Sequence, residues 1–373
     1  MKQKTLLTVL AASLLLLGAS CTKKEEVRPQ QENKISFNVL SDGALRATER
    51  TTTAFNADGN NFAVWGFIKS NHNRYVGTSA SVGTKIEYKG TTATYPWDYA
   101  NAADLAYWPS EAMNFFAVSD FGHTALSNVN VTDEAQSFDF TVPTANADQI
   151  DLMYASKLNL TKPADYKVPF VFKHALSQIV FKGQSKESNV KVSVQKIEVV
   201  NVKGKGTFTF PTAETADASA QGAWTSNETP NATYSTETET TEVTSAEAVT
   251  LSKSDGAFFV IPQTATAWTT QPVPAATGYT GQVALPAAGG NCYLKITLKL
   301  QFNGVYLIGD ASTFGTTYVP FGGVAWQPGK KYIYTLKFGA GYKEDGTPQL
   351  DPIRYNIAGI EGWGTPEEVD INL

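Results

Sequence analysis

The feature that most constrains the fold of this chain is a succession of short segments in which apolar and polar residues alternate. In the first of them, Ile35, Phe37 and Val39 alternate with Ser36 and Asn38. A period of two is typical of a β-strand with one buried face. Comparable strand-like segments recur at 62–68, 113–119, 138–142, 150–155, 176–181, 190–202, 207–210, 257–261, 293–302, 305–308, 332–338 and 369–373. No stretch keeps a helical period for more than about two turns.

The composition fits a chain of many short strands. The 373 residues include 29 Gly and 17 Pro, and 42% are hydrophobic. This is enough apolar surface for a core and excludes an intrinsically disordered chain. Because each half holds about seven or more strands whose apolar faces need covering, we expect an all-β protein of two antiparallel sandwich domains. After Ser20 no apolar run reaches the roughly 20 residues of a membrane-spanning helix.

The N-terminus has the residue pattern of an export signal. Lys2 and Lys4 precede an apolar stretch over 6–17, small residues follow, and residues 1–20 therefore form a predicted signal peptide. The run 17–21, Leu-Gly-Ala-Ser-Cys, resembles a bacterial lipobox, which implies that the Cys21 thiol is acylated and becomes the mature N-terminus. An ordinary signal cut beside a coincidental cysteine is the alternative.

The residues after Cys21 are polar and charged. Residues 22–26, Thr-Lys-Lys-Glu-Glu, resemble export tags that send lipoproteins to the outer face of the outer membrane, although a plain solvated tether has the same composition. We take 21–33 as a lipidated polar tether. The formal net charge of −5 becomes −7 when Lys2 and Lys4 leave with the signal. Since no stripe of basic residues interrupts this acidic balance, nucleic acid is not an expected partner.

The domain boundary is expected where turn residues interrupt the strands, over 161–167. We assign 34–166 to an N-terminal sandwich and 167–373 to a C-terminal sandwich, with a cut within 183–189 as the alternative. Between 211 and 249 the sequence is rich in Thr, Ala, Ser and Glu. This composition predicts a long exposed excursion from the second domain.

The chain offers little chemistry for catalysis. Only His72, His123 and His174 are present, none at metal-ligand spacing, and no Gly-x-Ser-x-Gly elbow occurs. If Cys21 carries lipid, Cys292 has no partner and is expected to be a buried, inert thiol. Sequence spacing cannot exclude a glycosidase-type carboxylate pair. We therefore nominate no catalytic residue, metal or cofactor and expect a protein that is not an enzyme.

Several motifs in order along the chain carry a family resemblance. They are Tyr-Trp-Pro at 107–109 before Asn-Phe-Phe-Ala at 114–117, Asp-Leu-Met-Tyr-Ala at 151–155, the run 170–179, the run 326–336 with its Trp-Gln-Pro-Gly-Lys start, and Gly-Trp-Gly at 362–364 before 369–373. Together with the lipobox, this order is similar to that of the fimbrillin family of Bacteroidetes.

The resemblance implies a fold and a mode of assembly. Fimbrillins are lipoprotein precursors of a type V pilus built from two transthyretin-like β-sandwiches. An Arg-directed protease removes the N-terminal segment with its first strand, and a strand from another subunit fills the vacated groove. In this chain the resemblance places the removable first strand within 34–46, with Ile35, Phe37 and Val39 as its core residues, and the cut between Arg46 and Ala47.

The resemblance leaves two positions open. Arg50 is an alternative cut site. Val369, Ile371 and Leu373 have the alternation of a donor strand, and Ile353, Tyr355 and Ile357 form a second candidate, although both segments could instead be internal strands of the second domain. The expected partners are other fimbrial subunits, with the outer membrane as anchor before cleavage and a fimbrium on the cell surface afterwards.

A second function remains open. The chain could be a lipid-anchored adhesin, or a tip or anchor subunit, that keeps its first strand and binds a host glycan or protein without polymerising. Exposed aromatic rings can stack on sugars, and Trp97, Trp224 and Trp268 are the candidates, although a core or loop-anchoring role is the more ordinary one for tryptophan.

Overall fold

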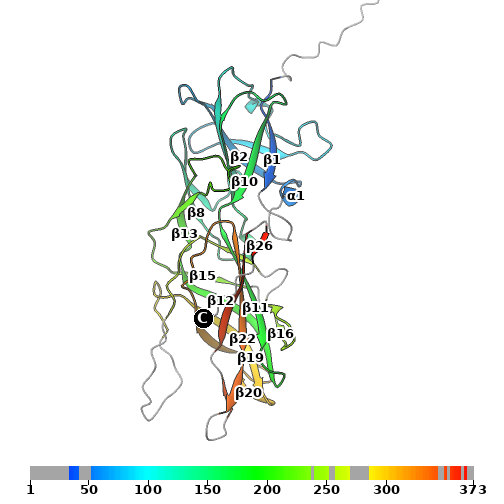
Figure 1. Cartoon of the computed structure of the whole chain (residues 1–373). Coiled ribbons are helices and arrows are strands. Elements are labelled where there is room, and N and C mark those ends of the chain that lie inside the picture. Colours follow the sequence, from blue (N-terminus) through cyan, green and yellow to red (C-terminus); the bar gives the residue numbers. More distant parts are fainter. Residues whose placement is uncertain are drawn as a thin grey trace, which may run out of the picture.

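The computed structural model describes residues 33–41, 52–236, 239–251, 257–268, 285–342, 348–350, 353–362 and 365–367. Within these ranges the protein is nearly all β, which confirms the predicted fold class. In the part of the chain that the structure describes, helical structure is limited to helix α1 (Thr52–Phe55) and two 3-10 turns, η2 (Ala102–Asp104) and η3 (Asn146–Asp148). The molecule is elongated, with the N-terminal strands at one end and the C-terminal strands at the other (Figure 1).

An eight-stranded sheet forms the N-terminal end. Its strands are β1 (Ser36–Ser41), β2 (Asn61–Ile68), β3 (Arg74–Val76), β4 (Thr84–Tyr88), β5 (Trp97–Tyr99), β6 (Met113–Ser119), β9 (Met153–Leu160) and β10 (Lys167–His174). They follow the order β3-β2-β4-β5-β1-β10-β9-β6, and β6 also pairs with β2. All of them except β3 therefore form a closed ring of paired strands. Alternate residues point into this ring, and its core is strongly aromatic, with Phe37, Phe62, Trp97, Phe115, Phe170 and Phe172 all buried.

A four-stranded sheet covers the outer side of this ring. It contains β7 (Leu126–Val131), β8 (Gln136–Thr141), β13 (Lys205–Thr209) and β14 (Ala223–Thr225), in the order β14-β13-β8-β7. The Phe116 ring on β6 lies 5.8 Å from Phe210, which in turn lies 6.1 Å from Phe138 on β8. The layer is thus held to the ring by aromatic packing.

Two sheets make up the C-terminal end. One contains β11 (Ser177–Ser185), β17 (Val249–Thr250), β18 (Phe258–Val260), β22 (Lys330–Phe338), β25 (Arg354–Gly362) and β26 (Thr365–Glu367). The other contains β12 (Val190–Val202), β15 (Ala232–Ser235), β16 (Thr241–Val243), β19 (Tyr293–Phe302), β20 (Val305–Ile308) and β21 (Gly315–Pro320). A separate ribbon pairs β23 (Ala340–Tyr342) with β24 (Pro348–Leu350).

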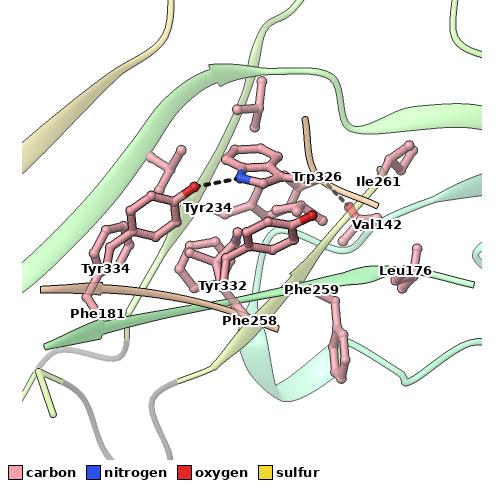
Figure 2. Packing of buried hydrophobic residues seen from close by; sticks show 14 of the residues in the cluster. Val142, Leu176, Phe181, Tyr234, Phe258, Phe259, Ile261, Trp326, Tyr332 and Tyr334 are labelled. Carbon is pink, nitrogen blue, oxygen red and sulfur yellow. Dashed lines mark hydrogen bonds between the residues drawn. The ribbon is translucent and has the colours of Figure 1, made fainter. Parts of the chain in front are cut away.

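Buried polar atoms in this C-terminal core are satisfied by specific partners. Trp326 Nε1 donates a hydrogen bond of 2.9 Å to the Tyr334 hydroxyl, and the Tyr234 hydroxyl donates to the Val142 carbonyl at 3.2 Å (Figure 2). Since an unpaired polar group in a core is costly, these bonds allow large aromatic side chains to fill it. The bond to Val142 also ties the C-terminal core to the loop after β8.

The structure differs from the expected organisation at the domain boundary. The strand that begins at Lys167, immediately after the expected boundary, pairs with β1 and β9 in the N-terminal sheet, and the chain enters the C-terminal sheets only after Ala175 and Leu176. The division into two domains itself stays a prediction, because the four-stranded sheet joins β8 to β13 and so combines segments from before and after that boundary.

The described part of the segment 211–249 is exposed over much of its length, as its composition predicts, but it is anchored to the sheets at several points. Tyr234 is fully buried on β15, and β15 and β16 both pair with β12. The buried Thr236 hydroxyl accepts a hydrogen bond from the Ile197 backbone N–H at 3.0 Å. Polar residues in this segment therefore serve as pairing and capping groups against the sheet.

Candidate functional site: the first strand and its groove

The first strand of the molecule lies inside the closed ring of paired strands. β1 runs parallel to β10 over six residue pairs, from Ser36 opposite Lys167 to Ser41 opposite Phe172. On its other side it pairs with β5 at a single position, where Phe37 lies opposite Trp97. Figure 1 shows β1 and β10 side by side at the N-terminal end. On the β5 side the Ile35 N–H also donates to the Ala106 carbonyl at 2.9 Å, and Lys34 forms an isolated bridge with Tyr107. Up to Phe37 the strand is therefore bonded on both edges, and over 38–41 the described pairing is with β10 alone.

The three predicted core residues of this strand all point into the ring. Ile35 is fully buried, and Phe37 and Val39 are each 2% exposed. The Phe37 ring lies 5.8 Å from Phe62 in an edge contact and 6.1 Å from Phe170 in a parallel one. The structure thus brings Ile35, Phe37 and Val39 together as one apolar edge seated in an aromatic groove.

The N-terminal end of β1 is clamped. Lys34 Nζ lies 2.6 Å from Asp98 Oδ1 and 4.3 Å from the centre of the Tyr95 ring, and the Lys34 side chain is only 10% exposed. The backbone is held as well, because the Trp108 N–H donates to the Asn33 carbonyl at 2.8 Å. A charged hydrogen bond that is largely shielded from water is stronger than an ordinary neutral one. We call Lys34, Asp98 and Tyr95 the clamp.

The C-terminal end of β1 has no comparable clamp among the described residues. Leu40 is 48% exposed, and the last pair of the strand is Ser41 opposite Phe172. The expected cut between Arg46 and Ala47, and the alternative at Arg50, follow this open end but lie outside the described residues. A chain cut on that side would begin to separate at its weaker end.

The remaining predicted residues fall in two groups. Cys21 and the donor candidates Val369, Ile371 and Leu373 lie outside the described residues. The second donor candidate is an internal strand, because β25, which contains Tyr355 and Ile357, pairs with β22 on one side and β26 on the other. Ile357 is 5% exposed and belongs to the C-terminal core.

The tryptophans considered for sugar stacking are not exposed platforms. Trp97 is 2% exposed and Trp268 is 7% exposed, and both belong to cores or their margins. Trp224 is partly buried, and its Nε1 donates to the Ala175 carbonyl at 2.6 Å. The core or loop-anchoring role that is more ordinary for tryptophan is thus confirmed for all three, because each packs against neighbouring aromatic or backbone groups.

The expectation that Cys292 is buried is confirmed, and His174 has a defined structural partner. Cys292 is a free thiol, 1% exposed, and burial raises its pKa to about 12. His174 Nδ1 lies 2.9 Å from Asp151 Oδ1 in a buried, hydrogen-bonded contact. Over the ranges that the structure describes, there is no group of three or more His, Cys, Asp or Glu placed to hold a metal ion, and no helix is both long and apolar enough to cross a membrane.

Residues of the groove wall were not nominated from the sequence. Val168, Phe170 and Phe172 on β10 are fully buried and alternate as the β1 residues do. That alternation was a visible signal for a strand, but nothing local shows that it faces β1. Nothing in the sequence marked Lys34 as a buried residue, because a lysine at the edge of a polar tether is usually solvated.

Comparison with models of known protein families shows which family this chain belongs to. The model of the family described as fimbrillin-like matches residues 46–352. The chain belongs to the fimbrillin-like family. The resemblance inferred from the motif order is thereby confirmed.

One solved structure supports this fold, and two others are similar to the chain over most of its length at lower scores. A fimbrial protein from Bacteroides vulgatus superposes with a TM-score of 0.51 at 18% identity, covering 89% of this chain and 99% of that one. A candidate cell adhesion protein from Bacteroides uniformis gives 0.44 at 15% identity, covering 88% and 99%. The tip fimbrial protein Mfa3 from Porphyromonas gingivalis, with a C-terminal truncation, gives 0.32 at 8% identity, covering 81% and 95%. A search of curated proteins found no match.

Proposed function

We propose that this fimbrillin-like protein is a fimbrial adhesion subunit that polymerises by exchanging its first strand for a strand of another copy or of another fimbrial subunit. The observation that carries the proposal is the seating of β1. Its three core side chains are buried in the ring, yet beyond Phe37 its described backbone pairing is with β10 alone. Family membership supports the fimbrial role and a non-enzymatic one.

Loss of β1 would leave a groove that must be filled. Removing Ile35, Phe37 and Val39 uncovers apolar surface at a cost of about 1.5–3 kcal/mol for each side chain. It also uncovers the backbone groups of β10 that pair with 36–41. An incoming extended strand replaces both contributions at once, through main-chain hydrogen bonds and alternate side-chain pockets.

The C-terminal tail is the proposed donor. Val369, Ile371 and Leu373 repeat the spacing of Ile35, Phe37 and Val39. The chain reaches this tail from β26, which is the terminal strand of its sheet in the described part of the protein. A donor reached from a sheet edge can leave without separating two paired strands.

The route to the cell surface follows from the N-terminus. Acylation of Cys21 would anchor the precursor in the outer membrane, and residues 21–33 would act as the tether. Cleavage after Arg46 then frees the subunit from both its lipid and β1. The alternative is an uncleaved, lipid-anchored adhesin or a tip or anchor subunit, in which the clamp holds β1 in place permanently.

The Arg46→Ala variant tests the proposal, with Arg50→Ala as the matched control. Wild type and Arg50→Ala are expected to give ladders of subunits on an unheated gel, whereas Arg46→Ala stays monomeric with Cys21 at its N-terminus. Mass spectrometry of each product identifies the cut. Ladders from Arg46→Ala that still contain the intact first strand would contradict strand exchange.

A further inference from the structure

A pocket lies on the opposite side of the N-terminal ring from the β1 groove. It has a volume of about 280 Å³ and opens between the outer face of β2 and β6 and the hairpin of β7 and β8. The apolar surface that a ligand can reach is formed by Val82, which is 43% exposed, with the partly buried Phe121, Leu126 and Val129. Trp65 and Phe138 lie beneath it in the core between the two layers. Small-molecule sites usually range from about 300 to 1,000 Å³, so this pocket suits a ligand of about one ring.

Both loops at the mouth of the pocket are ordered by internal hydrogen bonds. In the first, the Thr78 N–H donates to the Val82 carbonyl at 2.8 Å, and the Val82 N–H donates to the Ser79 hydroxyl at 3.0 Å. In the second, the His123 N–H donates to the Asp120 carbonyl at 3.0 Å. The pocket is therefore formed before any ligand arrives, which lowers the entropic cost of binding.

Backbone conformation at the mouth supports a role in binding. Asp120 has φ of 59°, a left-handed value that residues other than glycine rarely adopt. Gly83 is pressed against the core beneath the pocket, because a Cβ there would lie 3.0 Å from the Trp65 ring and 2.9 Å from the Val64 carbonyl oxygen. Strained and close-packed backbone of this kind concentrates at ligand sites.

The polar groups at the mouth include donors and acceptors. His123 Nδ1 accepts a hydrogen bond of 3.1 Å from the Ala125 N–H, so the neutral imidazole carries its proton on Nε2 and offers a donor there. The Asp120 carboxylate is an acceptor, and the hydroxyls of Ser81 and Thr124 can act as either. These groups together with the apolar surface suit a ligand with an apolar face and a hydroxyl-bearing edge.

From these features we infer that the pocket binds the pyranose ring of one neutral sugar, such as the terminal residue of a surface glycan. A pyranose combines an apolar C–H face with hydroxyls that both donate and accept. The carboxylate of Asp120 and the formal net charge of −5 disfavour an anionic sugar. The inference deepens the proposed adhesive role and rests on it for its biological context, whereas its chemistry rests on the pocket alone.

The test titrates the purified full chain with methyl glycosides of mannose, galactose and fucose and follows backbone amide shifts by NMR. Shifts are expected for residues that line the pocket, with a Kd in the millimolar range typical of a single-ring ligand. The methyl glycoside of N-acetylneuraminic acid is the anionic comparison, and N-acetylphenylalanine amide represents an aromatic side chain of a partner protein. Neither is expected to bind.

Two variants assign the binding to the pocket. Asp120→Asn keeps the shape and tolerates the left-handed backbone, and it is expected to weaken sugar binding about tenfold or more. Thr124→Trp places a large ring at the exposed rim and is expected to abolish binding. Asp104→Asn and Thr92→Trp are exposed matched controls and should bind as wild type does. Amide spectra show that each variant is folded.

The outcomes separate this inference from the proposed function. No glycoside shift up to about 10 mM, shifts outside the pocket, or binding of N-acetylphenylalanine amide alone would overturn the inference. Ladder formation on an unheated gel is measured in the same variants and is expected to be unchanged. Absence of glycoside binding in wild type with normal ladders, or unchanged binding in Asp120→Asn and Thr124→Trp, contradicts the pocket assignment only, and loss of ladders in wild type contradicts strand exchange only.

Discussion

Each end of this molecule contains one pair of parallel strands, and the two pairs are built differently. At the C-terminal end, β22 is parallel to β11 over eight residue pairs and antiparallel to β25 over eight more. At the N-terminal end, β1 has six pairs with β10 but only one with β5. Both strands bury their apolar faces completely. They differ in how many backbone hydrogen bonds must break before they can leave.

The difference shows that a strand can be fully buried and still be replaceable by another strand. A strand that is bonded on both edges can leave only if its sheet opens, whereas one bonded on a single edge can be replaced by another strand of similar pattern. Burial of Phe37 makes the exchange energetically demanding, and the second half of β1, whose described pairing is with β10 alone, gives an incoming strand a place to begin. The clamp at Lys34 then determines which end of β1 separates last.

Substitution of one core residue in each strand gives the largest expected effect. Phe37→Ala should destabilise the protein by about 3–5 kcal/mol and Leu336→Ala on β22 by about 2–5 kcal/mol, since both side chains are buried. After cleavage at Arg46, only Phe37→Ala should accelerate release of the β1 fragment. Denaturant unfolding measures the stability, and size exclusion measures the released fragment. Equal acceleration by Leu336→Ala would contradict the distinction between the strands.

Removal of the clamp should have a smaller effect. Lys34→Met keeps the apolar stem but loses the charged hydrogen bond to Asp98, so we expect a loss of about 1–3 kcal/mol. Release of the cleaved β1 fragment should become faster. Lys85→Met is the control, because the Lys85 to Glu87 pair is 3.5 Å long and exposed, and its loss should cost less than about 1 kcal/mol. A release rate unchanged by Lys34→Met would show that the clamp does not hold β1.

The buried thiol of Cys292 gives the smallest effect and tests whether the two ends are independent. Burial raises its pKa to about 12, so it should resist a thiol reagent at pH 8 in the folded protein. Its contribution to stability is complete below about pH 8.5, where the unfolded thiol begins to ionise, and is lost as the pH rises toward 12. Cleavage at Arg46 should change the labelling rate by less than about twofold. Rapid labelling on cleavage would show that loss of β1 opens the C-terminal core.

Much of this fold could be predicted from local pattern. The alternation of Ile35, Phe37 and Val39 identified β1 and its buried face, and the same reasoning located most of the long strands. Over 211–249 composition correctly predicted that much of the segment is exposed, but it did not reveal the fully buried Tyr234 or the hydrogen bond between Thr236 and the backbone of β12. A threonine paired with a strand looks the same in sequence as one in a solvated loop.

The groove was less predictable than the strand that fills it. The parallel pairing of β1 with β10 joins residues more than a hundred positions apart, and no local signal encodes it. The clamp likewise depends on Lys34 meeting Asp98 on the neighbouring strand β5, which is distant in sequence. The pocket beneath Asp120 and Gly83 arises where two layers meet, so periodicity within a single strand could not reveal it.

The mass of the subunit in assembled fimbriae tests the central claim most directly. Fimbriae are collected from the cell surface and dissociated, and the intact mass of this chain is measured. The account predicts a chain that begins at Ala47 and lacks β1. A lipidated chain that begins at Cys21 and retains Ile35, Phe37 and Val39 within assembled fimbriae would contradict it.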